Sequence, residues 1–283
     1  METADFLYGD FAVPSINTMG SIIPSDKKIS TLPLLQIQLG KISQREIARR
    51  LGIGKTTVNR WAGELGFVTR KHTSDETFFD TWSQHSVYLL GYILTDGNIA
   101  WNPIKGYYTL TITAAEKDKA HLELMRNLLQ STKPLLYAPK TRSYRLIVNS
   151  KILCRKLMRL GILPRKSLTV KFPKMPKVYL WHFIRGVVDG DGSVNYFARK
   201  RSPYFSVRIY SGSPKFLHKL VQTIKTLSGI EGNVRRVAKN VYGVDYSCSR
   251  GKKLAHFLYS GASISLERKY LQYKNNVLGG KRT

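Results

Sequence analysis

The chain has 283 residues, of which 42% are hydrophobic, and a formal net charge of +28. This length allows two or three domains with apolar cores. No apolar run reaches the roughly 18 residues that a membrane span needs, and no signal-peptide pattern opens the chain. So large a positive excess repels itself unless a polyanion is near, which favours nucleic acid as the partner. A basic surface of the ribosomal-protein kind is the alternative on composition alone.

The two cysteines, Cys154 and Cys248, lie far apart and match no zinc-binding spacing. Both fall in apolar patterns, so we expect buried, reduced thiols. This usage fits a cytoplasmic, nucleoid-associated protein of a prokaryote or of a phage-infected cell, with expression in an organelle as an open alternative.

The first 30 residues contain prolines, glycines and acidic residues without a sustained hydrophobic period, which predicts an irregular lead-in over 1–30. A small helical domain is predicted over 31–70, where Ser43 and Glu46 form a capping-box pair at the start of a helix. The polar stretch 71–83 is predicted to be a linker.

The second half of the helical domain contains a turn between two short helices. Gly52 and Gly54 bracket the turn, and Val58 and Trp61 face back toward a core. This spacing resembles the helix-turn-helix of bacterial DNA-binding proteins, with an ordinary helical hairpin as the alternative. Its last helix would expose side chains that can contact base edges or phosphates, and we expect DNA contacts from Lys55, Thr56, Thr57, Asn59 and Arg60.

Two copies of one mixed pattern fill the rest of the chain, over 84–170 and 171–283. Each copy predicts the element order α-β-β-α-β-β-α, which indicates an α+β fold. Apolar and polar residues alternate strictly in Tyr107–Thr113, as in a strand with one buried face. The other face of such a sheet is available to a ligand. On these open faces we place Tyr107, Thr109, Thr111, Thr113, Arg145, Tyr204, Ser206, Arg208, Tyr210 and Asp245.

A short apolar motif occurs once in each copy, at Leu89–Gly97 and at Ile184–Gly192. Each has a glycine in its middle and ends in Asp-Gly. Because helices approach closely only where side chains are small, the two central glycines, Gly91 and Gly186, are expected at a helix crossing. The crossing would bring Asp96 and Asp191 together, where like charges need cations between them. An Asp-Gly hairpin turn is the alternative for either copy alone.

These motifs resemble those of a single-chain LAGLIDADG homing endonuclease, over roughly residues 84–275. The glycines stand at the third motif position and the aspartates at the eighth, each followed by glycine. A second landmark follows the last helix of each copy, at Leu160–Ser167 and at Ser265–Lys269. The family carries a basic residue after this helix, so the resemblance places Lys166 and Lys269 near the cleavage site.

The resemblance implies a saddle of two pseudo-symmetric repeats whose antiparallel sheets lie along the major groove of double-stranded DNA. It further implies a monomeric enzyme of intron homing, which hydrolyses one phosphodiester per strand across the minor groove and leaves 3′ overhangs. Asp96, Asp191 and the backbone of Gly97 and Gly192 would hold Mg²⁺ or another divalent cation such as Mn²⁺. The catalytic residues would be Asp96, Asp191, Lys166 and Lys269.

Two other functions stay open on the same scaffold. A transcriptional regulator that combines degenerate repeats with a helix-turn-helix would be expected to lose the motif aspartates, and both are present here. An RNA maturase would assist intron splicing, and the sequence allows this role beside cleavage. Intron RNA is therefore an open second partner.

Overall fold

The structure is a computed structural model, which describes residues 43–64, 72–102, 104, 106–164, 168–199 and 202–279. The predicted lead-in over 1–30, the start of the helical domain and Lys166 lie outside these ranges. The chain divides into two compact units, Met1–Lys71 and His72–Thr283. No helix in the described ranges is long and apolar enough to cross a membrane.

The described part of the first unit, residues 43–64, contains two short helices joined by a tight turn, α3 (Gln44–Leu51) and α4 (Lys55–Glu64). The Ser43 hydroxyl caps α3 by accepting from the Glu46 backbone N–H at 3.2 Å. Gly52 closes α3 in the left-handed conformation, with φ at 61°. Val58 and Trp61 are buried, as the spacing predicts. The helices and their turn therefore agree with the expectation, while DNA binding by this unit stays a prediction.

The second unit contains the two predicted repeats. Each repeat folds into a four-stranded antiparallel sheet, with strand orders β1-β2-β4-β3 and β5-β6-β8-β7. The α+β fold class is confirmed, and α11 adds a helix to the predicted order of the second repeat. The first repeat runs α5 (Gln84–Asp96), β1 (Gly97–Asn102), β2 (Tyr107–Ala115), α6 (Lys119–Leu128), β3 (Leu136–Ala138), β4 (Ser143–Val148) and α7 (Lys151–Arg159). The second runs α8 (Leu180–Asp191), β5 (Ser193–Phe197), β6 (Tyr204–Ser211), α9 (Pro214–Ser228), β7 (Arg235–Ala238), β8 (Val241–Ser247), α10 (Cys248–Tyr259) and α11 (Glu267–Tyr273).

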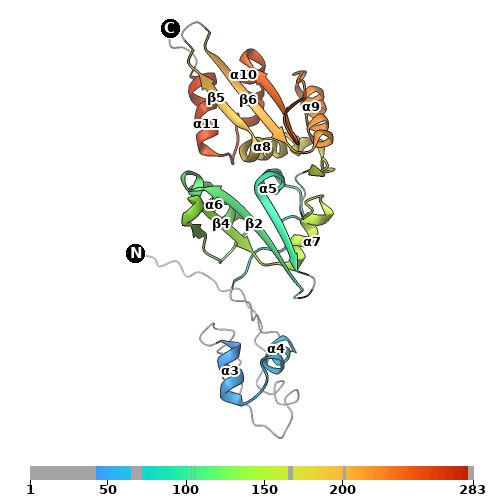
Figure 1. Ribbon diagram of the computed structural model, residues 1–283, viewed down its shortest axis with the longest axis vertical. Coiled ribbons are helices and arrows are strands. Elements are labelled where there is room, and N and C mark those ends of the chain that lie inside the picture. The colour runs from blue at the N-terminus through green and yellow to red at the C-terminus, as the bar shows by residue number, and fades with distance from the viewer. Residues whose placement is uncertain are drawn as a thin grey trace, which may run out of the picture. The chain divides into compact units, whose positions relative to one another are not determined.

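Each sheet buries one face against its helices. In β2, Leu110 and Ile112 are fully buried, while Thr109, Thr111 and Thr113 between and beside them stay partly exposed. The alternation follows from the period of two along a strand. Helices α6 and α7 cover the first sheet, α9 and α10 cover the second, and α5 and α8 lie between the sheets (Figure 1). Each sheet therefore keeps one open face.

Two expectations about this unit are wrong. The stretch 72–83 is not a free linker, because the Asp75 backbone N–H donates to the Leu129 carbonyl at 2.8 Å and Phe79 is buried in the core of the first repeat. Cys154 is buried as expected, but Cys248 is exposed at the start of α10.

Helices α5 and α8 pack against each other through Gly91 and Gly186. A Cβ atom on Gly91 would collide with the carbonyl oxygen of Phe183 and lie 3.1 Å from the Val187 nitrogen. A Cβ atom on Gly186 would collide with the carbonyl oxygen of Tyr88 and lie 2.9 Å from the Tyr92 nitrogen. Backbone therefore meets backbone at this crossing, and neither position has room for a side chain.

Gly91→Ala should destabilise the second unit. An alanine in a helix is ordinarily worth up to about 1 kcal/mol more than glycine, but here the two backbones must move apart, which costs about 1–3 kcal/mol net. Urea denaturation of the full chain measures this. Gly63→Ala in α4 is the control, because no atom lies within 4 Å of the new methyl group. A Gly91→Ala protein as stable as the wild type would contradict the crossing.

Candidate active site

Asp96 and Asp191 are the last residues of α5 and α8. The two helices run in the same direction at their crossing, since Tyr88 and Tyr92 contact Gly186 and Thr95 contacts Gly190. A Cβ atom on Gly190 would lie 3.3 Å from Asp96 Oδ2, so the Asp96 carboxylate lies beside the turn that carries Asp191. The two predicted acids therefore come to the same end of the helix pair.

Both carboxylates reach solvent, Asp191 more than Asp96. Each also lies at the negative end of a helix dipole, where a carboxylate is unfavourable and a cation is favoured. Such a placement costs stability and is expected where function needs it. The same ends would attract cations.

Within the described ranges, no three His, Cys, Asp or Glu side chains form a cluster that could hold a metal ion. Two carboxylates are nevertheless a sufficient protein share for Mg²⁺, which keeps several waters and completes its shell with substrate phosphates. The hard oxygen ligands of Asp96 and Asp191 therefore fit Mg²⁺ or Mn²⁺ when a phosphate is bound.

Asp189, two residues before Asp191, is 1% exposed, and both of its carboxylate oxygens accept hydrogen bonds. Its Oδ2 accepts from the Tyr88 hydroxyl and from the Leu266 backbone N–H, both at 2.8 Å. Its Oδ1 accepts from the Tyr259 hydroxyl at 2.7 Å. Burial raises the pKa of Asp189, while the charge of Lys269 and these three bonds oppose the rise. Tyr88 belongs to the first repeat, so Asp189 ties the two repeats together inside the core.

Lys269 is 2% exposed and caps the C-terminal end of α8. Its Nζ donates to the carbonyl oxygens of Gly192 at 2.6 Å, Val188 at 2.7 Å and Asp189 at 2.8 Å. These bonds use the three N–H groups of a lysine ammonium. Burial lowers the pKa of Lys269 to about 8, against the opposing attraction of Asp189.

This geometry bears on the expected catalytic role of Lys269. A direct contact with a DNA phosphate would require one of the three short bonds to break. The carbonyl of Gly192, an expected metal ligand, likewise already accepts from an ammonium. In this arrangement Lys269 positions the turn of Asp191, and its contact with phosphate stays a prediction, as do the roles of Lys166 and Gly97.

A short strap, defined as residues 264–269, carries several of these contacts. The buried Arg185 side chain donates to the Ile264 carbonyl at 2.8 Å. At the other end, Arg268 Nε donates to Asp118 Oδ1 of the first repeat at 3.0 Å. The strap therefore connects α8 of the second repeat to Asp118 of the first repeat.

The sequence did not reveal the buried polar residues Tyr88, Arg185 and Tyr259. It also did not reveal the structural role of Asp189. Arg185 and Asp189 carried a usable signal, since each places a charge inside an apolar motif where the first copy has Leu90 and Leu94. Tyr88 and Tyr259 gave none, because a tyrosine in an apolar helix is usually read as core.

Ten residues were expected on the open sheet faces. Most of them are partly or fully exposed there, including Thr109, Thr111 and Arg145. The expectation that Ser206 is exposed is wrong, because Ser206 is 1% exposed and its hydroxyl donates to Asp245 Oδ1 at 2.7 Å. It lies on the expected face, but it is buried beside Asp245 of β8.

The expected DNA-contacting residues of α4 lie on its solvent side. Lys55, Thr56, Asn59 and Arg60 are exposed and Thr57 is partly exposed. The Asn59 side chain accepts from Gln44 Nε2 at 3.1 Å. This side of the helix is thus largely exposed among the described residues, as a recognition helix requires.

The second repeat matches a known family. Residues 179–263 match the family model of a LAGLIDADG-like domain. The matched segment runs from α8 to the end of α10 and includes Asp191. No curated protein matches the chain.

Several solved structures align with part of the chain. A LAGLIDADG meganuclease, I-AabMI, bound to uncleaved DNA aligns with a TM-score of 0.46 at 16% identity, covering 64% of this chain and 85% of that one. The homing endonuclease I-WcaI bound to its DNA recognition sequence aligns at 0.48 and 12%, covering 69% and 91%. I-SmaMI bound to an uncleaved DNA target in the presence of calcium ions aligns at 0.46 and 11%, covering 70% and 91%.

Lys269→Met should lower the free energy of unfolding by at least about 2 kcal/mol, because it leaves carbonyl groups at the end of α8 buried without a donor. The loss is smaller than the bonds alone suggest, since methionine also removes the cost of burying a charge. Thermal and urea unfolding measure it. Lys253→Met on the exposed side of α10 is the matched control. Unchanged stability of Lys269→Met with complete loss of DNA cleavage would instead favour a purely catalytic lysine.

Proposed function

We propose that the protein is a site-specific double-strand DNA endonuclease of the homing type, acting as a monomer. The observation that carries the proposal is the placement of Asp96 and Asp191 at the same end of the α5–α8 pair. The net charge of +28 supports a polyanionic substrate. The open faces of two antiparallel sheets supply a surface on which a duplex can lie.

In this proposal the two sheets bind adjacent major-groove segments, and the intervening minor groove lies over the ends of α5 and α8. Asp96 and Asp191 would hold divalent cations, Mg²⁺ or Mn²⁺, against the scissile phosphates. A cation bound there supplies an activated water and stabilises charge on the phosphate. One acid for each strand gives two cuts, and cuts facing each other across the minor groove leave 3′ overhangs.

The remaining residues orient the acids. Lys269 holds the carbonyl groups at the end of α8, so the backbone before and after Asp191 has one conformation. Leu266 of the same strap donates its backbone N–H to Asp189, two residues before Asp191. Catalysis needs groups fixed within a fraction of an ångström, and buried, fully bonded neighbours provide this for Asp191. Lys166 is proposed to act on the half-site of the first repeat.

Asp96→Asn and Asp191→Asn should each abolish double-strand cleavage and leave DNA affinity nearly unchanged, because one charge of a cation site is lost while the basic surface remains. The substrate is a duplex that the wild-type protein selects from a randomised library, labelled separately on each strand. Glu231→Gln is the control, since this acid is exposed and pairs with Lys225.

Full linearisation by either variant would rule out the assignment of the two acids. Specific binding by the wild-type protein without any cleavage would favour a transcriptional regulator on the same scaffold.

We also propose that the first unit extends the contact with DNA through α4. Removing residues 1–71 should weaken affinity by about tenfold or more, since several cationic contacts to phosphate are lost, and shorten the footprint at one end. The cut position should not move. The deletion stops before residue 72 because residues 72–83 pack on the first repeat. Footprinting of both proteins on one duplex measures this. Arg60→Ala in the full chain is a second, smaller change to the same surface and should weaken affinity less than the deletion. An unchanged footprint would show that α4 does not bind the DNA.

A further inference from the structure

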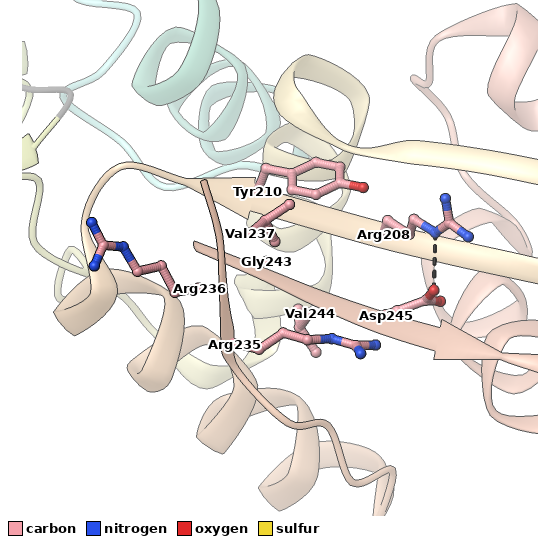
Figure 2. A pocket seen from close by; sticks show the side chains of 8 residues that line it. All are labelled: Arg208, Tyr210, Arg235, Arg236, Val237, Gly243, Val244 and Asp245. Carbon is pink, nitrogen blue, oxygen red and sulfur yellow. Dashed lines mark hydrogen bonds and ion pairs between the residues drawn. The ribbon is translucent and has the colours of Figure 1, made fainter. Parts of the chain in front are cut away.

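A hollow of about 260 Å³ opens on the open face of the second sheet, among strands β6, β7 and β8. Arg208, Arg235, Tyr210 and Asp245 are among its lining residues, and Figure 2 shows them around the hollow. Gly243 makes room for the Tyr210 ring, since a Cβ atom there would lie 3.0 Å from two ring carbons. The hollow therefore combines an aromatic wall with a dense set of charges.

Asp245 has little acceptor capacity left for a ligand. Its Oδ1 accepts from the hydroxyl groups of Ser206 at 2.7 Å and Ser247 at 2.8 Å. Its Oδ2 accepts from Arg208 Nε at 2.9 Å. A carboxylate offers about four acceptor sites, so three are in use. These bonds also lower the pKa of Asp245 against the effect of its partial burial, so the group stays ionised.

Arg208 is held while its terminal nitrogens stay available. Its register partner across the sheet is Asp245, which binds Nε. Its guanidinium also lies over the Phe197 ring, with Cζ 5.2 Å from the ring centroid. Figure 2 shows Nε facing Asp245 and the two Nη atoms at the outer end of the guanidinium, one of them pointing away from Asp245. A fork of two N–H donors is therefore presented to the open face in one orientation.

We propose that Arg208 reads one guanine in the half-site contacted by the second repeat, with Asp245 as the residue that positions it. This rests on the proposed endonuclease function. A fixed guanidinium fork matches the O6 and N7 acceptors that guanine presents in the major groove. Because the side chain is already ordered, less conformational freedom is lost on binding. Asp245 does not read cytosine itself, since its oxygens are engaged.

Among the described residues of the first repeat, the position equivalent to Arg208 holds no arginine paired with an acid. The register pairs Gly97 with Ile112, and continuing the pairing of β5 with β6 by one residue places Gly192 opposite Ile209. Thr111 of β2 is thus the structural equivalent of Arg208, and its cross-strand partner is Ile147 in place of an acid. A guanine preference from a paired arginine is accordingly expected at this position in one half-site and not at the equivalent position in the other.

The test is selection of a randomised duplex library by the full-length protein, followed by sequencing of the bound fraction. The wild type should enrich guanine at a position in one half-site, and Arg208→Ala should lower that preference at least about fivefold while other positions are unchanged. Asp245→Asn should weaken the same position and no other. Arg208→Lys keeps the charge and the overall affinity, but should lose much of the guanine preference. Thr111→Ala is the matched control and should leave that position unchanged.

A uniform loss of affinity for Arg208→Ala at every position would overturn the proposal, since it marks a phosphate contact. A second, separate position altered by Asp245→Asn would overturn the positioning role and make Asp245 a reader. If the wild type enriches guanine and both Arg208→Ala and Arg208→Lys keep that enrichment, the role of Arg208 is wrong while the proposed endonuclease function stands. If the wild-type protein enriches no sequence at all, both this inference and the proposed function are wrong. Melting curves of each variant show that the second unit stays folded.

Discussion

The close approach of α5 and α8 at Gly91 and Gly186 is the constraint on which the rest of the second unit depends. Carbonyl oxygens occupy the space where side chains would otherwise stand, so each helix tolerates little else at that point. The approach places Thr95 against Gly190 and Asp96 beside the turn of Asp191. It also sets the two sheets on opposite sides of one helix pair. The acids that we propose to be catalytic are therefore positioned by the packing of two glycines several residues away.

The two repeats differ in how they support their acids. In the second repeat, Asp189, Arg185 and Lys269 are all buried, and each is bonded to backbone or to a tyrosine hydroxyl. Buried charges weaken a fold unless they are fully paired, but a paired set enforces one arrangement. The first repeat has Leu90 and Leu94 at the two matching motif positions. At these two motif positions the repeats therefore differ, with bonded charged side chains in the second repeat and buried leucines in the first.

Much of this architecture follows from periods and spacings in the sequence. The alternation in β2 and the repeated glycine and aspartate gave the sheets, the crossing and the shared position of Asp96 and Asp191. The contacts of Lys269 could not be foreseen, because a lysine after a helix gives no sign of which carbonyl groups it will meet. Ser206 lies on the predicted face but is buried, since the period of a strand assigns a face and does not decide how exposed a side chain is. The polar composition of 72–83 likewise concealed the buried Phe79.

The central claim is that two carboxylates at one end of a helix pair support metal-dependent hydrolysis of DNA. The most direct measurement is cleavage of a duplex that the protein itself selects, followed over time with Mg²⁺ and with EDTA, with each strand labelled. One cut in each strand is expected with Mg²⁺, and intact DNA that is still bound is expected with EDTA. Cleavage that continues in EDTA, or tight sequence-specific binding with no cut in Mg²⁺ or Mn²⁺, would contradict it.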